Sequence, residues 1–132
     1  MIEAEMNYHV CVWIDHREAR VYAVGQHDSE IIEIDSNSPV YHIHRKADHV
    51  GMGTQPADPS FLADVARALS PAKAILICGP GRARTELAGY LNDHFPTIGK
   101  RVWGIEAMDH PTDREMIALA RKYFRAADRM HA

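Results

Sequence analysis

Apolar stretches of strand length, separated by polar turns, fill the start of the chain. Residues 10–14 and 19–24 place apolar side chains at alternating positions, and the polar residues 15–18 between them supply a turn. This pattern predicts a hairpin. Residues 25–28 form a second turn, and the three isoleucines within 30–34 predict a third strand before the sequence becomes polar again.

Helical spacing begins after residue 57. Asp58 is a typical N-cap and Pro59 a typical first-turn residue, and Ser70 and Pro71 stop the helix that they open. Apolar residues recur every three or four positions in this helix and predict one buried face. The residues of this face are Phe61, Leu62, Val65, Ala66 and Leu69.

Strands and helices alternate in the rest of the chain. Residues 74–78 are continuously apolar, as in a strand buried on both faces of a sheet, and a glycine-rich turn at 79–81 leads to a second helix over 82–95. A fifth strand is expected over 102–106. The apolar positions of the second helix are Leu87, Tyr90, Leu91 and Phe95.

The last helix opens with Thr112 and Glu115, which have the spacing of a capping box. Its expected buried residues are Met116, Ile117, Ala120, Tyr123, Phe124 and Ala127. The whole order is βββαβαβα, which predicts one α/β domain over 1–132, because no repeat or linker divides it. Since strand-helix-strand crossovers demand parallel pairing, we expect a mixed five-stranded sheet with helices on its faces and the first strand beside the fourth.

Composition and charge narrow the function classes. The chain has 132 residues, 46% of them hydrophobic and 25% charged, which is ordinary for a globular domain. Residues 1–36 hold eight acids against Arg17 and Arg20, a net charge of −6, so the remainder carries +3 of the total −3. An anionic partner is therefore expected to meet the later part of the chain. No signal peptide or membrane-length apolar run is present, so we expect a cytoplasmic protein without a membrane partner.

The two cysteines, Cys11 and Cys78, lie within apolar strand-like stretches. This favours small buried hydrophobic residues over a disulfide or a redox pair.

The segment 42–55 has no apolar period and is rich in charge, histidine and glycine. Arg45, Lys46 and His49 suit phosphate or RNA, while Gly51 and Gly53 allow a close approach of the backbone to a partner. A polar Gln55 follows at the end of this segment. We therefore expect residues 45–57 to be exposed and mobile.

The element order resembles the ribonuclease H-like middle domain of archaeal and eukaryotic class I peptide-chain release factors and of Pelota. Local matches are the basic loop that ends in Gly53-Thr54-Gln55, where release factors carry Gly-Gly-Gln, the segment 75–87 with its apolar strand, glycine turn and Thr-Glu-Leu, and the closing strand and helix. The stretches 13–20 and 120–130 are similar to the short stand-alone bacterial proteins named translational machinery proteins. This second resemblance covers nearly the whole chain.

The resemblance implies a translation-associated protein that binds the ribosome or tRNA and promotes hydrolysis of the peptidyl-tRNA ester. In release factors the loop glutamine helps water attack this ester, a role that falls here to Gln55, with Gly53 and Thr54 shaping the loop. Thr54 replaces the second glycine, and a β-branched residue cannot adopt every glycine conformation. The codon-reading and partner-binding domains of those factors have no counterpart in this sequence, so this chain alone is not expected to read a stop codon. A ribosome or RNA binder without catalysis is the alternative.

Further basic residues could contact RNA. Arg82 and Arg84 at the start of the second helix could hold an anion with its free amides, although no phosphate-loop motif is present and no cofactor is expected. Arg121, Lys122 and Arg125 gather in the last helix, where they could instead complement its dipole.

Two other classes of function remain as alternatives. A metal-binding or regulatory protein could use the loop histidines His42, His44 and His49. The first two share one strand face and could hold Zn²⁺ with Asp48 or another ligand, but His-x-His spacing is a weak signal and we assign no metal ligand. A nuclease would need several carboxylates that converge on two metals. Asp15 could supply one of them, yet no acid closely follows the strand at 74–78.

Overall fold

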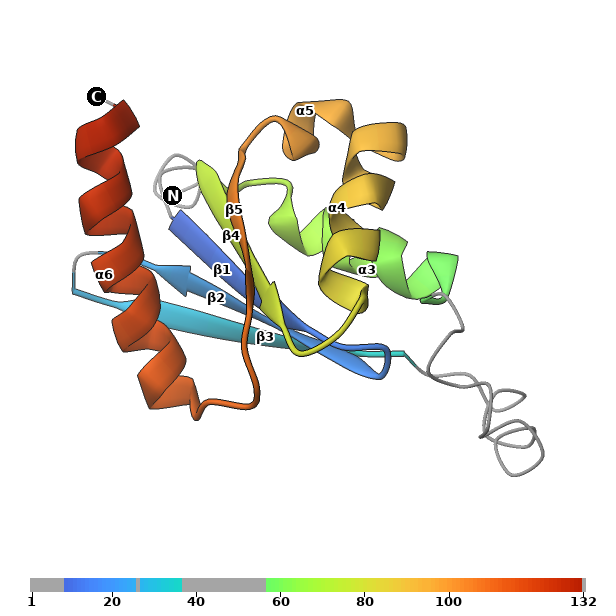
Figure 1. Ribbon diagram of the computed structural model, residues 1–132, viewed down its shortest axis with the longest axis horizontal. Coiled ribbons are helices and arrows are strands. Elements are labelled where there is room, and N and C mark those ends of the chain that lie inside the picture. The colour runs from blue at the N-terminus through green and yellow to red at the C-terminus, as the bar shows by residue number, and fades with distance from the viewer. Residues whose placement is uncertain (1–8, 26, 37–56, 132) are drawn as a thin grey trace.

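A computed structural model describes residues 9–25, 27–36 and 57–131 (Figure 1). The segment 42–55 lies outside the described residues. Of the residues 45–57 that were expected to be exposed, Ala57 is described, and the expectation is wrong for it, because its side chain packs in a hydrophobic core and is 5% exposed. Three of the residues to which the resemblance assigns catalysis, Gly53, Thr54 and Gln55, and the proposed RNA contacts Arg45, Lys46 and His49 therefore remain predictions.

Five strands form one mixed sheet in the order β3-β2-β1-β4-β5. They are β1 (His9–Ile14), β2 (Glu18–Val24), β3 (Ser29–Asp35), β4 (Ala74–Gly79) and β5 (Val102–Ala107). The first three pair antiparallel, whereas β4 pairs parallel with both β1 and β5. Val12 of β1 lies opposite Ile77 of β4, which confirms the predicted neighbours and direction.

In the part of the chain that the structure describes, four helices connect and cover the strands: α3 (Pro59–Leu69), α4 (Ala83–His94), α5 (Pro96–Gly99) and α6 (Asp113–His131). The short α5 was not expected from the sequence. It arises because Pro96 disfavours helical dihedrals at Phe95, which adopts φ −139° and ψ 64°, while proline itself fits the first turn of a new helix. The predicted second helix therefore ends one residue earlier than its apolar spacing indicates.

The sheet separates two hydrophobic cores, as the layers of Figure 1 illustrate. On one face α3 and α4 cover Val10, Val12 and Ile75, and on the other α6 covers Cys11, Trp13 and Leu76 by means of Met116, Ala120 and Phe124. All six residues of β4 are buried, as its continuous apolar sequence predicts. The edge strand β3 differs, since Ile31 and Ile32 remain 38% and 42% exposed.

Both predicted helix caps are present. The side chain of Asp58 accepts a hydrogen bond from the Ser60 amide at the start of α3. At the start of α6, Thr112 N donates to Glu115 Oε1 at 2.8 Å and Glu115 N donates to Thr112 Oγ1 at 3.2 Å, a reciprocal capping box. Within the described residues, the helices are too short or too polar to cross a membrane.

Candidate functional site

The carboxyl ends of the parallel strands β1, β4 and β5 meet at one edge of the sheet. Gly79 at the end of β4 lies against β1 so closely that a Cβ on it would be 2.1 Å from the carbonyl oxygen of Ile14. The amide of Met108, just after β5, donates to Gly79 O at 2.9 Å. Because ligands of open α/β sheets bind at the carboxyl ends of the strands, this edge is the first place to look for a site.

Ser36 and Ala57, the described residues on either side of segment 37–56, are both held by hydrogen bonds at this same edge. On the side that follows β3, Ser36 N donates to the carbonyl oxygen of Arg17, in the turn between β1 and β2, at 2.8 Å. On the side that precedes α3, Ala57 N donates to Glu86 Oε1 at 3.0 Å. The chain therefore departs from and returns to the neighbourhood of one turn.

Glu86, in the first turn of α4, connects that return point to the turn. Its Oε1 lies 3.0 Å from Nε2 of His16, and its Oε2 lies 3.7 Å from Nη2 of Arg82. The Glu86 side chain is only 19% exposed, so its three partners replace most of the water that a carboxylate needs. His16 and Glu86 both stand in stretches that resemble known proteins, 13–20 and 75–87, but nothing in the sequence indicates that the two side chains meet.

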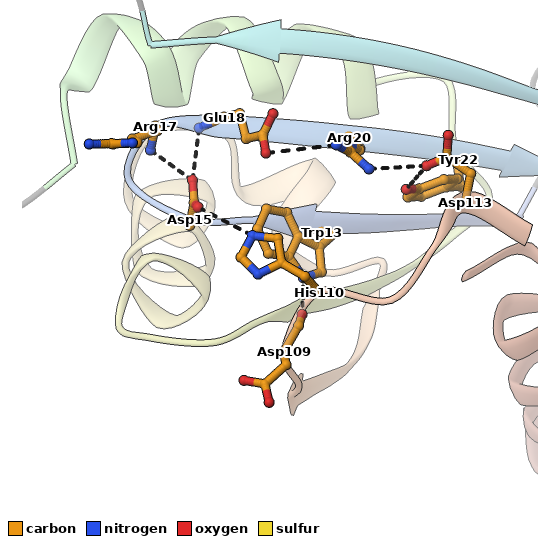
Figure 2. A network of polar contacts seen from close by, with 9 residues as sticks. All are labelled: Trp13, Asp15, Arg17, Glu18, Arg20, Tyr22, Asp109, His110 and Asp113. Carbon is orange, nitrogen blue, oxygen red and sulfur yellow. Dashed lines mark hydrogen bonds and ion pairs between the residues drawn. The ribbon is translucent and has the colours of Figure 1, made fainter. Parts of the chain in front are cut away.

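A second set of polar contacts lies on the face of the sheet that α6 covers (Figure 2). Asp15 Oδ1 accepts hydrogen bonds from the amides of Arg17 and Glu18 at 2.8 and 2.9 Å and so closes the turn after β1. In the next strand, Arg20 Nη1 donates to Asp113 Oδ1 at 3.2 Å, and Arg20 Nη2 lies 3.9 Å from Glu18 Oε2.

Tyr22 completes this set of contacts from within the core. Its hydroxyl donates to Asp113 Oδ1 at 2.6 Å, and the residue is 1% exposed. Burial, together with this hydrogen bond to a carboxylate, raises the pKa of Tyr22 to about 12. Positions 18, 20 and 22 share one face of a strand, which is the only sequence signal that could have grouped them.

The loop after β5 approaches the same turn. Trp13 Nε1 donates to the carbonyl oxygen of Asp109 at 2.6 Å, and the Trp13 ring packs against His110 with ring centroids 4.3 Å apart. These contacts bring Nε2 of His110 to 4.0 Å from Oδ2 of Asp15. Of Trp13, Asp15, Asp109 and His110, only Asp15 is a candidate site residue on the sequence alone, as a possible carboxylate of a nuclease.

Arg82 and Arg84, the two arginines that are predicted to bind RNA, lie at the start of α4, close to Glu86 in the chain. Arg82 is 60% exposed and pairs with Glu86. Arg84 instead turns back on the loop between β4 and α4, where its Nη1 donates to the carbonyl oxygens of Gly79 and Gly81. Of these two, Arg82 is the more available to a partner.

The cations of α6 occupy the other end of the sheet. Arg121 donates to the carbonyl oxygens of Gly25 and Asp28, at the turn between β2 and β3, at 3.3 and 3.0 Å. Lys122 and Arg125 are exposed. The seven residues of β2 separate this group from the first, a distance of roughly 20 Å at the usual rise per residue. The predicted cations that the structure describes therefore form two separate groups.

A cavity of about 320 Å³ lies beside this second group of cations. Its lining residues are His9, Val24, Gly25, Arg121, Phe124, Arg125 and Asp128. His9 Nε2 contacts Asp128 Oδ1 at 3.2 Å, so a carboxylate offsets part of the positive charge at the opening.

The two cysteines are fully buried, as predicted, but they also lie side by side. The Sγ atoms of Cys11 and Cys78 are 3.6 Å apart on neighbouring strands, and both residues are 0% exposed. The hydrogen bond to Cys78 and the burial of the thiol raise the pKa of Cys11 well above its usual value. A protonated thiol is a poor nucleophile, so the pair has the chemistry of core residues.

Comparisons with known proteins identify the class of fold. No family model and no curated protein matches the chain. Among solved structures, Pelota from Archaeoglobus fulgidus matches with a TM-score of 0.62 and 17% identity over 87% of this chain and 31% of that protein. Pelota from Thermoplasma acidophilum gives 0.56 and 19% over 81% and 30%. An archaeal translation termination factor, aRF1, gives 0.55 and 15% over 96% and 39%.

The chain is therefore an α/β domain that shares its fold with a domain of Pelota and of an archaeal termination factor, as the sequence resemblance indicated. It spans about a third of the length of each of these proteins. At such identities the likeness concerns the fold. The similarity to stand-alone bacterial proteins stays a prediction.

Proposed function

We propose that this chain acts in translation, binding the ribosome or tRNA through the segment 42–55. The observation that carries the proposal is the shared fold with Pelota and aRF1, the second of which is a translation termination factor by name. Release factors carry their Gly-Gly-Gln loop in the same place in the chain order as Gly53-Thr54-Gln55, between the third strand and the next helix.

The hydrogen bonds that hold Ser36 and Ala57 in place support this proposal. Both neighbours of the segment are hydrogen-bonded at one edge of the sheet, so the two points that the segment must connect are fixed. Fixing both ends of a loop lowers the entropy that is lost when its tip enters a binding site. In this proposal Arg45 and Lys46 contact RNA phosphates, His49 assists them, and Arg82 adds a cation beside the base of the loop.

We further propose that the loop can promote hydrolysis of the peptidyl-tRNA ester. Gln55 would orient the attacking water, and Gly51 and Gly53 would let the backbone approach the substrate. A neutral amide suits this role, because it donates and accepts hydrogen bonds without being titrated. Thr54 restricts the backbone where release factors have glycine, so any activity of the natural loop is expected to be low.

Sedimentation with purified ribosomes tests the binding proposal. We expect co-sedimentation that weakens as salt is raised, and a shallower salt dependence when Arg45 and Lys46 are replaced by Gln. The matched control replaces Lys73 and Lys100 by Gln, since these exposed lysines lie just before β4 and β5, at the opposite end of the sheet. This control should leave the salt dependence unchanged. Absence of co-sedimentation at low salt would refute the proposal.

Release of peptide from ribosome-bound peptidyl-tRNA tests the catalytic proposal separately. Gln55→Ala is expected to abolish release, whereas His49→Ala weakens binding in a salt-sensitive way and Thr54→Gly increases release. If neither the natural chain nor Thr54→Gly releases peptide while both still co-sediment, the chain binds without catalysing. Zinc that stays with the chain through chelation and is lost on replacing His42 and His44 would instead favour the metal-binding alternative.

A further inference from the structure

The geometry points to a binding site for a divalent transition-metal ion formed by Asp15, Glu18 and His110. One ligand atom from each of these residues lies within 4.8 Å of the others. They come from three parts of the chain, namely the end of β1, the start of β2 and the loop after β5. Figure 2 shows the His110 ring next to the carboxylate of Asp15, and the Glu18 carboxylate directed toward Arg20. This inference is independent of the proposed role in translation.

The two carboxylates are held close together by the turn between β1 and β2. Asp15 and Glu18 are its first and last residues, and Asp15 N donates to Glu18 O at 3.0 Å. Oδ1 of Asp15 is occupied by two amides of the turn, while its Oδ2 accepts no hydrogen bond from the described residues. Like charges on facing positions of a hairpin repel each other, and a bound cation would convert this repulsion into attraction.

Arg20 offsets only part of this negative charge. Its Nη2 lies 3.9 Å from Glu18 Oε2, beyond hydrogen-bonding distance, whereas its Nη1 donates to Asp113 at 3.2 Å. The side chains of Asp15 and Glu18 are 25% and 32% exposed, so water screens their repulsion incompletely. The Glu18 carboxylate is therefore available as a ligand.

His110 supplies a nitrogen ligand whose position is set by the core. Its ring packs against Trp13, and Trp13 holds the neighbouring carbonyl of Asp109 by a hydrogen bond of 2.6 Å. Nε2 of His110 is 4.0 Å from Oδ2 of Asp15, too far for a hydrogen bond. Two ligands that are each about 2.1 Å from one ion lie roughly 3 to 4 Å apart, so this gap suits an ion between them.

The donor set selects the class of ion. Two carboxylates and one imidazole suit Zn²⁺ or Mn²⁺, whereas Ca²⁺ and Mg²⁺ prefer sites made of oxygen alone. The His110 side chain is 62% exposed, so the ion can enter from solvent and its remaining coordination positions face outward. Water or an anion would fill those positions.

Calorimetric titration with Zn²⁺ and Mn²⁺ tests the site. The untagged full chain is used with His42, His44 and His49 replaced by Ala, because these loop histidines would compete as ligands. We expect one ion per chain. Asp15→Asn keeps Oδ1 as an acceptor for the turn amides, and His110→Phe keeps the ring against Trp13, so both variants preserve the fold. Each is expected to weaken the binding about tenfold or more, as is Glu18→Gln.

Two measurements make the result specific. With Trp103→Phe, Trp13 is the single tryptophan, and its fluorescence is expected to change with the same midpoint as the heat signal. The matched control His27→Gln replaces an exposed histidine in another turn and should leave the affinity unchanged. Equal affinities in the chain that lacks only the loop histidines and in its Asp15→Asn and His110→Phe variants would overturn the inference, as would the absence of saturable binding below millimolar concentration. Equal binding of Mg²⁺ would overturn the assigned class of ion.

Discussion

The imidazole Nε2 of His16 lies 3.0 Å from the carboxylate Oε1 of Glu86, although the two residues are 70 positions apart in the chain. The same oxygen accepts the amide of Ala57, so one carboxylate connects the turn after β1, the helix α4 and the residue that follows segment 37–56. This arrangement sets where that segment rejoins the fold.

Removing this carboxylate is expected to loosen the return point of the loop. Glu86→Ala leaves the Ala57 amide, which belongs to a residue only 5% exposed, without its acceptor. We expect the free energy of unfolding to fall by about 1 to 3 kcal/mol and amide exchange at Ala57 to accelerate. Hydrogen exchange followed by mass spectrometry or NMR measures this directly.

Asp93→Asn serves as the control, since Asp93 is an exposed acid of the same helix. Unchanged protection of Ala57 in Glu86→Ala would contradict the anchoring role. In Glu86→Gln, the protection of the Ala57 amide should lie between that in Glu86→Ala and that in Asp93→Asn. The amide oxygen of Gln can still accept from Ala57, but it carries no charge.

Gly79 lies so close to β1 that adding one methyl group at this position is expected to lower the stability of the fold strongly. In Gly79→Ala the new Cβ would meet the backbone oxygen of Ile14 at 2.1 Å, so the two strands must separate. We expect a loss of stability of about 2 to 3 kcal/mol in chemical denaturation. Gly81→Ala is the matched control, because a Cβ there has no neighbour within 4 Å. Equal stabilities of the two variants would show that β1 and β4 tolerate the added methyl group.

The raised pKa of Tyr22 predicts a loss of stability at high pH. Its pKa is about 12 in the fold and about 10 in an unfolded chain, so the unfolded chain releases this proton first. The contribution to stability is complete below pH 10 and is lost as the pH rises toward 12. In Tyr22→Phe, stability should therefore fall less steeply over this interval than in the natural chain, as denaturation at each pH will reveal. Identical slopes would contradict the prediction, and Tyr90→Phe provides the control.

The two cysteines are expected to resist thiol reagents in the native state. Both residues are 0% exposed, and the pKa of Cys11 is raised by the hydrogen bond to Cys78 and by burial. Reaction with an aromatic disulfide at pH 8 should therefore be slow and should accelerate with added denaturant, because thiolate forms only when the chain opens. Cys11→Ala and Cys78→Ala isolate each thiol. Rapid stoichiometric labelling of the native chain would contradict this.

The strands, the main helices and their caps could be predicted because each depends on residues close together in the chain. The continuous apolar stretch at 74–78 predicts burial on both faces, and the structure places β4 between β1 and β5. Asp58 and Thr112 cap helices through residues two or three positions away. The exception is α5. The apolar spacing predicts one helix through Phe95, whereas Pro96 ends that helix and begins a new one.

The candidate site was predicted less completely, because its contacts join residues that lie far apart in the chain. The basic segment 42–55 was recognisable from composition, yet nothing in its own residues indicates that its base is held by Arg17 and Glu86. The sequence lists Arg82 and Arg121 as possible RNA contacts without indicating that the length of β2 separates them, because that separation depends on the fold.

By itself, the sequence determined the order of elements, the parallel neighbours and the residues that face the cores, because the alternation of apolar and polar positions repeats the same local information many times. The tertiary structure alone decided which polar side chains meet. Tyr22 and Asp113 are 91 residues apart and Cys11 and Cys78 are 67 apart, and each pair forms only after strand register and helix packing are set. A contact that depends on one alignment of distant elements leaves no periodic pattern along the chain, so the fold has to be known before such a contact is visible.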